Sequence, residues 1–255
     1  MFAVMPDRYY CQHPIAGADV TLEGPEARHL ASVMRAEVGD TVVLFDGTGF
    51  EFQASVTRIG KRDVQLTIES KAEVDREAAV QLTLAVAMPK SERQKWLIEK
   101  AVELGVARIV PIVAQRSVVK LKASGIERLR RTVIEASKQC GRNRLMEIAD
   151  PVAWKELIAD GAGDEEKLIA HPGDTEEGGS TDLQVRTPAT TPSNNSPNIL
   201  AAIGPEGGFT DDEVQSAIAA GWQSVSLGPR ILRVETAALS LAARLLDNLG
   251  PIVSL

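Results

Sequence analysis

The sequence predicts an α/β protein in which a small β-barrel precedes a larger domain built on a parallel sheet. The chain has 255 residues, enough for one large domain or two small ones at about 150 residues per domain. The first 72 residues are typical of short strands, whereas from residue 80 onward strands and helices alternate, as in a parallel sheet covered by helices. We therefore expect the barrel at residues 1–72 and the second domain at 79–255, joined by a charged linker at 71–78.

The first domain is expected to contain several strands and one helix. An apolar run at 41–45 ends at a glycine-containing turn at 46–49, and the segments 50–57 and 63–68 alternate apolar and polar side chains, as half-buried strands do. Pro25 is suited to the first turn of a helix. The apolar residues after it recur every three or four positions, at Ala27, Leu30, Ala31 and Met34, as on the buried face of a helix. Short strands with a single helix favour a small barrel.

The second domain is expected to alternate strands with helices. Apolar runs predict strands at 80–88, 106–110, 168–170, 198–203 and 223–227. Capping residues predict helices that follow Ser91, Ser124 and Thr210. Gly105 should end the first of these helices, and Glu213 should complete a capping box with Thr210 in the third. A last, very apolar helix is expected at 235–249. The segment 173–198 is rich in Gly, Ser, Thr, Pro and acids. It has little to bury, so we expect a mobile insertion there.

Composition narrows the class of function. No run of about 18 apolar residues occurs, so we expect neither a transmembrane helix nor a membrane partner. Two cysteines and three histidines are too few for a metal site rich in these residues, and they suit a reducing cytoplasm. The net charge is −7, yet residues 88–147 hold six Lys and eight Arg against six Glu, a local charge of +8. This asymmetry favours an anionic partner, although solvated helix faces would give the same count.

Two loops, at 204–210 and 227–237, each follow a predicted strand and precede a predicted helix. Their glycines allow the backbone to approach a ligand closely, but neither loop has the spacing of a phosphate-binding or dinucleotide-binding motif. Glu206 suits a ligand with positive charge, and Ile231 and Leu232 offer apolar contact. The loops are suited to surround a flat apolar ring. Ordinary β–α turns remain the alternative.

These loops carry a resemblance to a known family. Residues 203–213 read Ile-Gly-Pro-Glu-Gly-Gly-Phe-Thr-x-x-Glu, and residues 227–237 read Leu-Gly-x-Arg-Ile-Leu-Arg-x-Glu-Thr-Ala. Both resemble the ribosomal small subunit methyltransferase E family, bacterial 16S ribosomal RNA uridine N3-methyltransferases of the SPOUT superfamily. The segments Met-Pro-Lys at 88–90 and Gln-Cys-Gly-Arg-Asn-Arg at 139–144 resemble the basic motifs of that family. The resemblance covers most of the chain except 173–198.

The resemblance implies a PUA-like barrel, then a SPOUT domain with a parallel sheet and a C-terminal trefoil knot. It also implies a cytoplasmic homodimer, S-adenosylmethionine as methyl donor, and N3 of uridine 1498 in 16S ribosomal RNA as acceptor. The cofactor would contact Ile203, Gly204, Pro205, Glu206, Gly207, Gly208, Leu227, Gly228, Ile231, Leu232, Arg233, Glu235, Thr236 and Ala237. The RNA would contact Arg8, Arg28, Arg35, Lys90, Arg93, Lys95, Arg116, Arg142 and Arg144.

Methyl transfer to uracil N3 requires the loss of the proton that N3 carries at neutral pH. Glu206 or Glu235 could accept this proton, and Arg233 could stabilise charge that develops on the uracil carbonyl oxygens. Two other interpretations stay open. The chain could be a SPOUT methyltransferase for a different RNA nucleotide, or an RNA-binding assembly factor of the small ribosomal subunit without catalytic activity.

Overall fold

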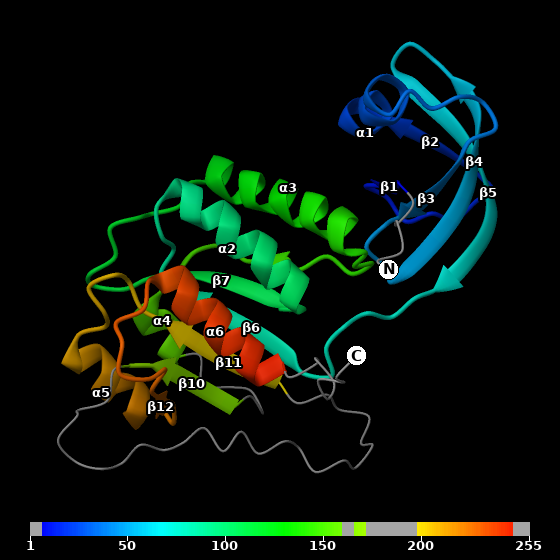
Figure 1. Ribbon diagram of the computed structural model, residues 1–255. Coiled ribbons are helices and arrows are strands. Elements are labelled where there is room, and N and C mark those ends of the chain that lie inside the picture. The colour runs from blue at the N-terminus through cyan, green and yellow to red at the C-terminus, as the bar shows by residue number, and fades with distance from the viewer. Residues whose placement is uncertain (1–6, 160–165, 172–197, 247–255) are drawn as a thin grey trace. The chain divides into compact units, whose positions relative to one another are not determined.

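The computed structural model describes residues 7–159, 166–171 and 198–246. The expected insertion at 173–198 therefore lies outside the described residues, apart from Asn198. The chain divides into two compact units, coloured by residue number in Figure 1. The first unit holds Met1–Glu77 and Ile134–Leu145, and the second holds Ala78–Val133 and Met146–Leu255.

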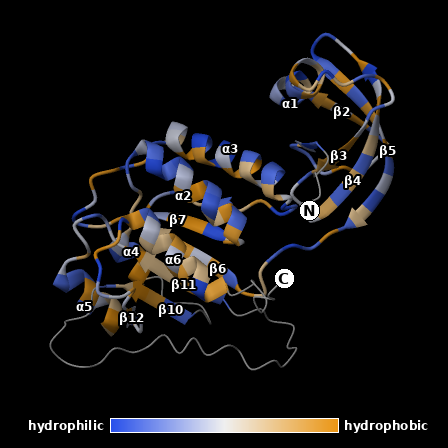
Figure 2. Ribbon diagram, in the orientation of Figure 1, coloured by the Kyte–Doolittle hydropathy of each residue, from blue (hydrophilic) through white to orange (hydrophobic). Residues whose placement is uncertain are grey.

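The first unit is built on a five-stranded sheet. Its strands, in spatial order, are β1 (Arg8–Tyr10), β3 (Thr41–Phe45), β4 (Phe50–Ile59), β5 (Asp63–Glu73) and β2 (Asp19–Glu23). β1 runs parallel to β3, and the other neighbours are antiparallel. Hydropathy alternates along β4 and β5 in Figure 2, because one face of each strand covers the core. Within the described residues no pairing joins β1 to β2, so the sheet forms a path rather than the closed barrel that we expected.

Two details of this unit differ from the sequence prediction. β5 continues to Glu73 and occupies the first part of the expected linker. The single expected helix divides into α1 (Gly24–Arg28) and a π-helical turn at His29–Val33. In this turn the Met34 N–H donates to the carbonyl of His29 five residues earlier, at 3.0 Å. The π-helical turn rotates the residues that follow it relative to their positions in a regular α-helix. Met34 is therefore exposed, although its spacing predicted a buried position.

The second unit is built on a parallel sheet, as predicted. Its strands, in spatial order, are β12 (Gln223–Val225), β10 (Glu166–Ala170), β11 (Asn198–Ile203), β6 (Gln81–Val86), β7 (Arg108–Val113) and β8 (Glu147–Ile148). Each of these pairs is parallel, and β9 (Val152–Ala153) also pairs with β7 in parallel. β6 and β11 are almost fully buried, since they lie in the interior of the sheet.

The helices are α2 (Ser91–Leu104), α3 (Ala123–Cys140), α4 (Trp154–Ala159), α5 (Asp211–Ala219) and α6 (Val234–Leu246). α2 ends at Gly105 in the left-handed conformation, with φ 90°, as the sequence predicted. The expected capping roles of Ser91 and Ser124 are wrong. Lys90 occupies the N-cap of α2 without a side-chain hydrogen bond, and α3 already begins at Ala123.

Two groups of buried side chains hold the second unit together. α2 and α6 pack against each other, with Leu97 and Leu241 among their fully buried residues. An aromatic cluster places the Trp154 ring 4.6 Å from the Phe209 ring and 5.2 Å from the Trp222 ring. The end of the expected last helix, including Leu249, lies outside the described residues. In the described part of the chain, no helix is long and apolar enough to span a membrane.

Candidate functional site

The two glycine-rich loops leave the same edge of the parallel sheet. Ile203, the last residue of β11, is level with Val86 of β6 and with Ala170 of β10. Ala170 is in turn level with Val225, the last residue of β12. The loops that follow β11 and β12 therefore start at the carboxyl edge, separated by a single strand. Ligands of α/β sheets bind at this edge.

The first loop, 204–210, is shaped by the close approach of Gly204 to Phe209. A Cβ atom on Gly204 would lie 2.9 Å from Cδ2 of the Phe209 ring and 3.1 Å from its backbone nitrogen. Phe209 is buried against Trp154, so the ring has no free space to move into. A glycine is therefore needed at 204 to let the loop turn back onto the core.

Glu213 anchors this loop to the segment that follows β7. Its Oε2 accepts a hydrogen bond from the Thr210 N–H at 2.9 Å, which completes the predicted capping box at the start of α5. Its Oε1 accepts from the Gln115 N–H at 2.8 Å. The neighbouring Arg116 donates through Nη1 to the carbonyl of Gly207 at 2.7 Å. The sequence predicted the cap, but it held no signal for the contacts of residues 115 and 116, which lie about a hundred positions away in the chain.

In the structure the second loop covers 226–233, because β12 ends at Val225 and α6 begins at Val234. It presents its backbone and an apolar side chain to solvent. Gly228 adopts φ 103°, a conformation that L side chains rarely adopt. Ile231 is 98% exposed, and Arg233 is also exposed. In the first loop, Glu206 and Gly207 are exposed as well. Accessible backbone, an exposed apolar side chain and an exposed carboxylate suit a ligand with an apolar ring and positive charge.

Glu235 lies in the first turn of α6, directly after the second loop. The residue is only 6% exposed. Its Oε1 lies 3.6 Å from Nε of Arg93, which comes from α2. Its Oε2 is buried and has no hydrogen-bond partner among the described residues. Arg93 is therefore engaged with the candidate site through Glu235, although the sequence suggested that it contacts RNA directly.

Of the nine proposed RNA-contacting residues, six are exposed, Arg93 is half-buried and two are buried. Exposed cations of the set are Arg28, Arg35, Lys90, Lys95, Arg116 and Arg144. Arg8 and Arg142 are buried, with 7% and 4% exposure, and their assignment to an open RNA-binding surface is wrong. Each is held by a carboxylate of its own unit, Arg8 by Glu51 and Arg142 by Glu77.

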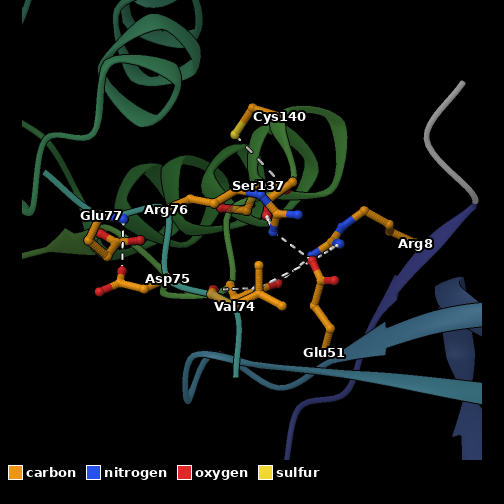
Figure 3. Close-up of polar contacts among 10 residues, drawn as sticks. Arg8, Glu51, Val74, Asp75, Arg76, Glu77, Ser137 and Cys140 are labelled. Carbon is orange, nitrogen blue, oxygen red and sulfur yellow. Dashed lines mark hydrogen bonds and ion pairs between the residues drawn. The ribbon is translucent and has the colours of Figure 1, made fainter. Parts of the chain in front are cut away.

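The two buried arginines belong to a polar cluster of the first unit, shown in part in Figure 3. Arg8 donates through Nη1 to Oε1 of Glu51 at 2.5 Å, and Arg76 reaches the same oxygen at 2.6 Å. Arg142 donates to Oε2 of Glu77 at 2.5 Å. Partial burial raises the pKa of Glu51, but the hydrogen bonds from Arg76 and Arg8 outweigh burial and hold that pKa below its ordinary value.

The fold and the site define the class of protein as an RNA methyltransferase. A family model described as an RNA methyltransferase domain matches residues 76–246, and one described as an RNA methyltransferase PUA domain matches residues 22–69. Curated relatives and solved structures define the family more closely. Ribosomal RNA small subunit methyltransferase E from Bacillus subtilis is 30% identical over 223 residues, which cover 86% of each chain.

Two similar solved structures carry the donor. Ribosomal RNA small subunit methyltransferase E from Neisseria gonorrhoeae, bound to S-adenosyl methionine, is 32% identical with a TM-score of 0.81, over 94% of this chain and 96% of that one. A methyltransferase from Legionella pneumophila, in complex with the cofactor SAM, is 34% identical with a TM-score of 0.83, over 95% and 97%. The chain belongs to the ribosomal RNA small subunit methyltransferase E family.

Proposed function

We propose that this protein transfers a methyl group from S-adenosylmethionine to N3 of a uridine in 16S ribosomal RNA, uridine 1498. The observation that carries the proposal is that the two glycine-rich loops leave the same edge of the parallel sheet, with one strand between them. Family membership and the S-adenosylmethionine of the two solved relatives support it. The base and its position rest on the resemblance of the two loop motifs alone.

The residues of the two loops fit this cofactor. Gly207 and Gly228 offer exposed backbone groups for hydrogen bonds to an adenine ring or a ribose, and Ile231 offers apolar surface for the ring. Glu206 provides negative charge for a sulfonium. When bound, the cofactor supplies an activated methyl group on a cationic sulfur. The full set of contacts would come from the residues carried over by motif at 203–208, 227–228, 231–233 and 235–237.

The protein's part in the chemistry is to place the acceptor nitrogen in line with that methyl group and to remove its proton. Positioning of this kind supplies a large share of the rate in methyl transfer. Glu206 and Glu235 are the two carboxylates proposed as proton acceptors, and Arg233, which is exposed, is proposed to stabilise charge that develops on the carbonyl oxygens of uracil.

The exposed cations are proposed to hold the RNA through its phosphates. Arg28, Arg35 and Arg144 belong to the first unit, and Lys90, Lys95 and Arg116 to the second. N3 of a paired uridine is hidden in the helix, so the target base would leave its stack to react. Affinity for RNA should then fall as salt rises.

Three further features of the family are part of the proposal. They are a trefoil knot in the C-terminal part of the second unit, a homodimer, and a location in the cytoplasm. The homodimer rests on the resemblance, because Leu241, Ala242 and Leu245 of α6 are already buried within one copy of the chain. Sedimentation of a 27.4 kDa species at micromolar concentration would contradict the homodimer.

The test uses labelled S-adenosylmethionine and small ribosomal subunits from a strain that lacks its own enzyme of this family. We expect label on one uridine, mapped by mass spectrometry as 3-methyluridine. Gly207→Val is the matched control, since its Cβ would meet only the flexible Arg116 side chain, at 3.3 Å. This variant should fold but fail to bind the cofactor in calorimetry. Label on another nucleotide would favour a different specificity, and cofactor binding without transfer would favour an assembly factor.

A further inference from the structure

We infer that Oε2 of Glu235 accepts the N3–H of the target uracil and selects that base, and that Arg93 positions the carboxylate from its other oxygen. This inference rests on the proposed function and assigns two of its roles. Two observations carry it: within the described residues, one buried carboxylate oxygen of Glu235 has no hydrogen-bond partner, and the ion pair with Arg93 involves the other oxygen.

The state of Glu235 requires explanation, because a desolvated carboxylate oxygen without a hydrogen bond is unfavourable. Only 7% of the Glu235 side chain is exposed, so water replaces little of the lost hydration. The residue is in the first turn of a 13-residue helix, directly after a loop of the candidate site. A ligand that brings an N–H group to this position would satisfy the orphaned oxygen.

The other carboxylates at the carboxyl edge are less suited to this role. Glu206, Asp211 and Asp212 are exposed, so water competes for their oxygens and weakens any hydrogen bond to a base. Glu213 is buried, but Thr210 and Gln115 occupy its two oxygens. Among the described carboxylates of these two loops and the helices after them, Glu235 alone combines burial with a free oxygen. This comparison assigns the proton acceptor that the sequence left open between Glu206 and Glu235.

Arg93 acts as a positioning residue. Its Nε lies 3.6 Å from Oε1 of Glu235, and its backbone N–H donates to the Lys90 carbonyl at 3.0 Å, which fixes it in the first turn of α2. α2 and α6 pack together, so the guanidinium and the carboxylate are held on adjacent helices. The positive charge on one side of the carboxylate orients it and leaves Oε2 directed away from the ion pair.

The chemistry of the bases explains the selection. Uracil carries a hydrogen on N3 and donates it, whereas cytosine presents a lone pair at N3. A carboxylate at that position attracts the first and repels the second, and a site built for one hydrogen-bond pattern rejects the other strongly. As the N3–C bond forms, the N3 proton passes to Oε2, and the electron pair of the C–S bond passes to sulfur. A cation, an anion and a neutral base thus become a thioether, a carboxylic acid and a methylated base.

The experiment measures single-turnover methyl transfer to small subunits that carry either uridine or cytidine at the target position. The variants are Glu235→Gln, Glu235→Ala, Arg93→Ala and Arg93→Lys. The matched control is Glu92→Gln, an exposed carboxylate next to Arg93 in the chain. Calorimetry of S-adenosylmethionine and thermal unfolding accompany each variant, so that a fold defect is separated from a chemical one.

We expect Glu235→Gln to lower the transfer rate by about 10²–10⁴-fold at saturating S-adenosylmethionine, so that any change in cofactor affinity, which calorimetry measures, stays separate from the chemical effect. It should also narrow the preference for uridine over cytidine, because an amide can donate as well as accept. In Glu235→Ala, formate should restore part of the rate relative to chloride at equal ionic strength. Arg93→Ala should slow methyl transfer, and Arg93→Lys should restore part of the rate. The double variant that combines Arg93→Ala with Glu235→Gln should be no slower than Glu235→Gln alone, since both residues act through one carboxylate.

Two failures are distinguishable in this design. If the original protein transfers no methyl group to the subunit, or transfers it to another type of base, both the proposed function and this inference are refuted. If the original protein methylates the uridine and folded Glu235→Gln does so at the same rate and with the same base preference, the function stands and the role of Glu235 is refuted. Additive effects of Arg93→Ala and Glu235→Gln would refute the positioning role.

Discussion

Substitution of Gly204 by alanine is the most direct test of how the first loop is built. The added methyl group would lie 2.9 Å from Cδ2 and 3.1 Å from Cε2 of the Phe209 ring, and 3.1 Å from the backbone nitrogen of that residue. The first two contacts could be relieved only by moving a ring that is 3% exposed and packed 4.6 Å from Trp154. The third involves backbone, so the loop itself must shift.

Forcing one methyl group into a packed site costs about 1–3 kcal/mol. For a protein of this size that corresponds to a melting temperature lower by about 2–12 °C. The shifted loop should also weaken S-adenosylmethionine binding, because residues 204–208 are proposed to contact it. Scanning calorimetry measures the first effect, and isothermal titration measures the second.

The control is Gly207→Ala, in the same loop. A Cβ there would meet only aliphatic atoms of Arg116, at 3.3 Å and beyond, and this long side chain can move aside. We expect its melting temperature to stay within about 2 °C of the original, as for most surface substitutions. Equal melting temperatures for the two alanine variants would refute the argument that the Gly204–Phe209 contact sets the shape of the loop.

Three further predictions concern the first unit. Arg142→Ala should destabilise the protein by about 3 kcal/mol, because it leaves the largely buried Glu77 without its partner, and urea unfolding would measure the loss. Because the pKa of Glu51 is lowered in the folded protein, this residue adds stability at pH values above the ordinary glutamate pKa, and that stability is lost as the pH falls through the pKa of the folded state. Glu51→Gln should therefore make the free energy of unfolding depend less steeply on pH in the acidic range, as urea unfolding at several pH values would show. Burial raises the pKa of the Cys11 thiol to about 12, so iodoacetamide at pH 8 should label this cysteine only after unfolding, as peptide mass spectrometry would show; fast labelling of the native protein would contradict its burial.

The sequence predicted those parts of the fold that depend on neighbouring residues. The strand Thr41–Phe45 and the end of α2 at Gly105 lie where the apolar run and the glycine placed them. The capping box of Thr210 and Glu213 is present with both of its hydrogen bonds. These features follow from side chains and backbone within a few residues, so local periodicity and capping rules are sufficient to find them.

Features that depend on distant residues were missed or misread. The π-helical turn at His29–Val33 adds one residue to a helical repeat, which a fixed 3.6-residue period cannot show. β1 has only three residues and is held in place by pairing with β3, so it has too few positions for a pattern. The glycine loops were found from the sequence, but the role of Gln115 as a donor to Glu213 depends on the folding of a remote segment against them.

The cationic stretch at 88–147 shows how burial changes a conclusion drawn from charge. Its net +8 counts only the acids within the stretch. Four of its cations are paired with carboxylates outside it: Lys138 with Glu26 at 3.0 Å, Arg142 with Glu77 at 2.5 Å, Arg93 with Glu235 at 3.6 Å and Arg130 with Asp150 at 3.9 Å. The charge that this stretch can offer to phosphates is therefore at most +4, because each pair already neutralises one unit. The salt dependence of RNA affinity follows the number of phosphates neutralised. The stretch should therefore contribute less to this dependence than its composition indicates. The exposed Arg28 and Arg35 of the first unit become correspondingly more important among the proposed RNA contacts.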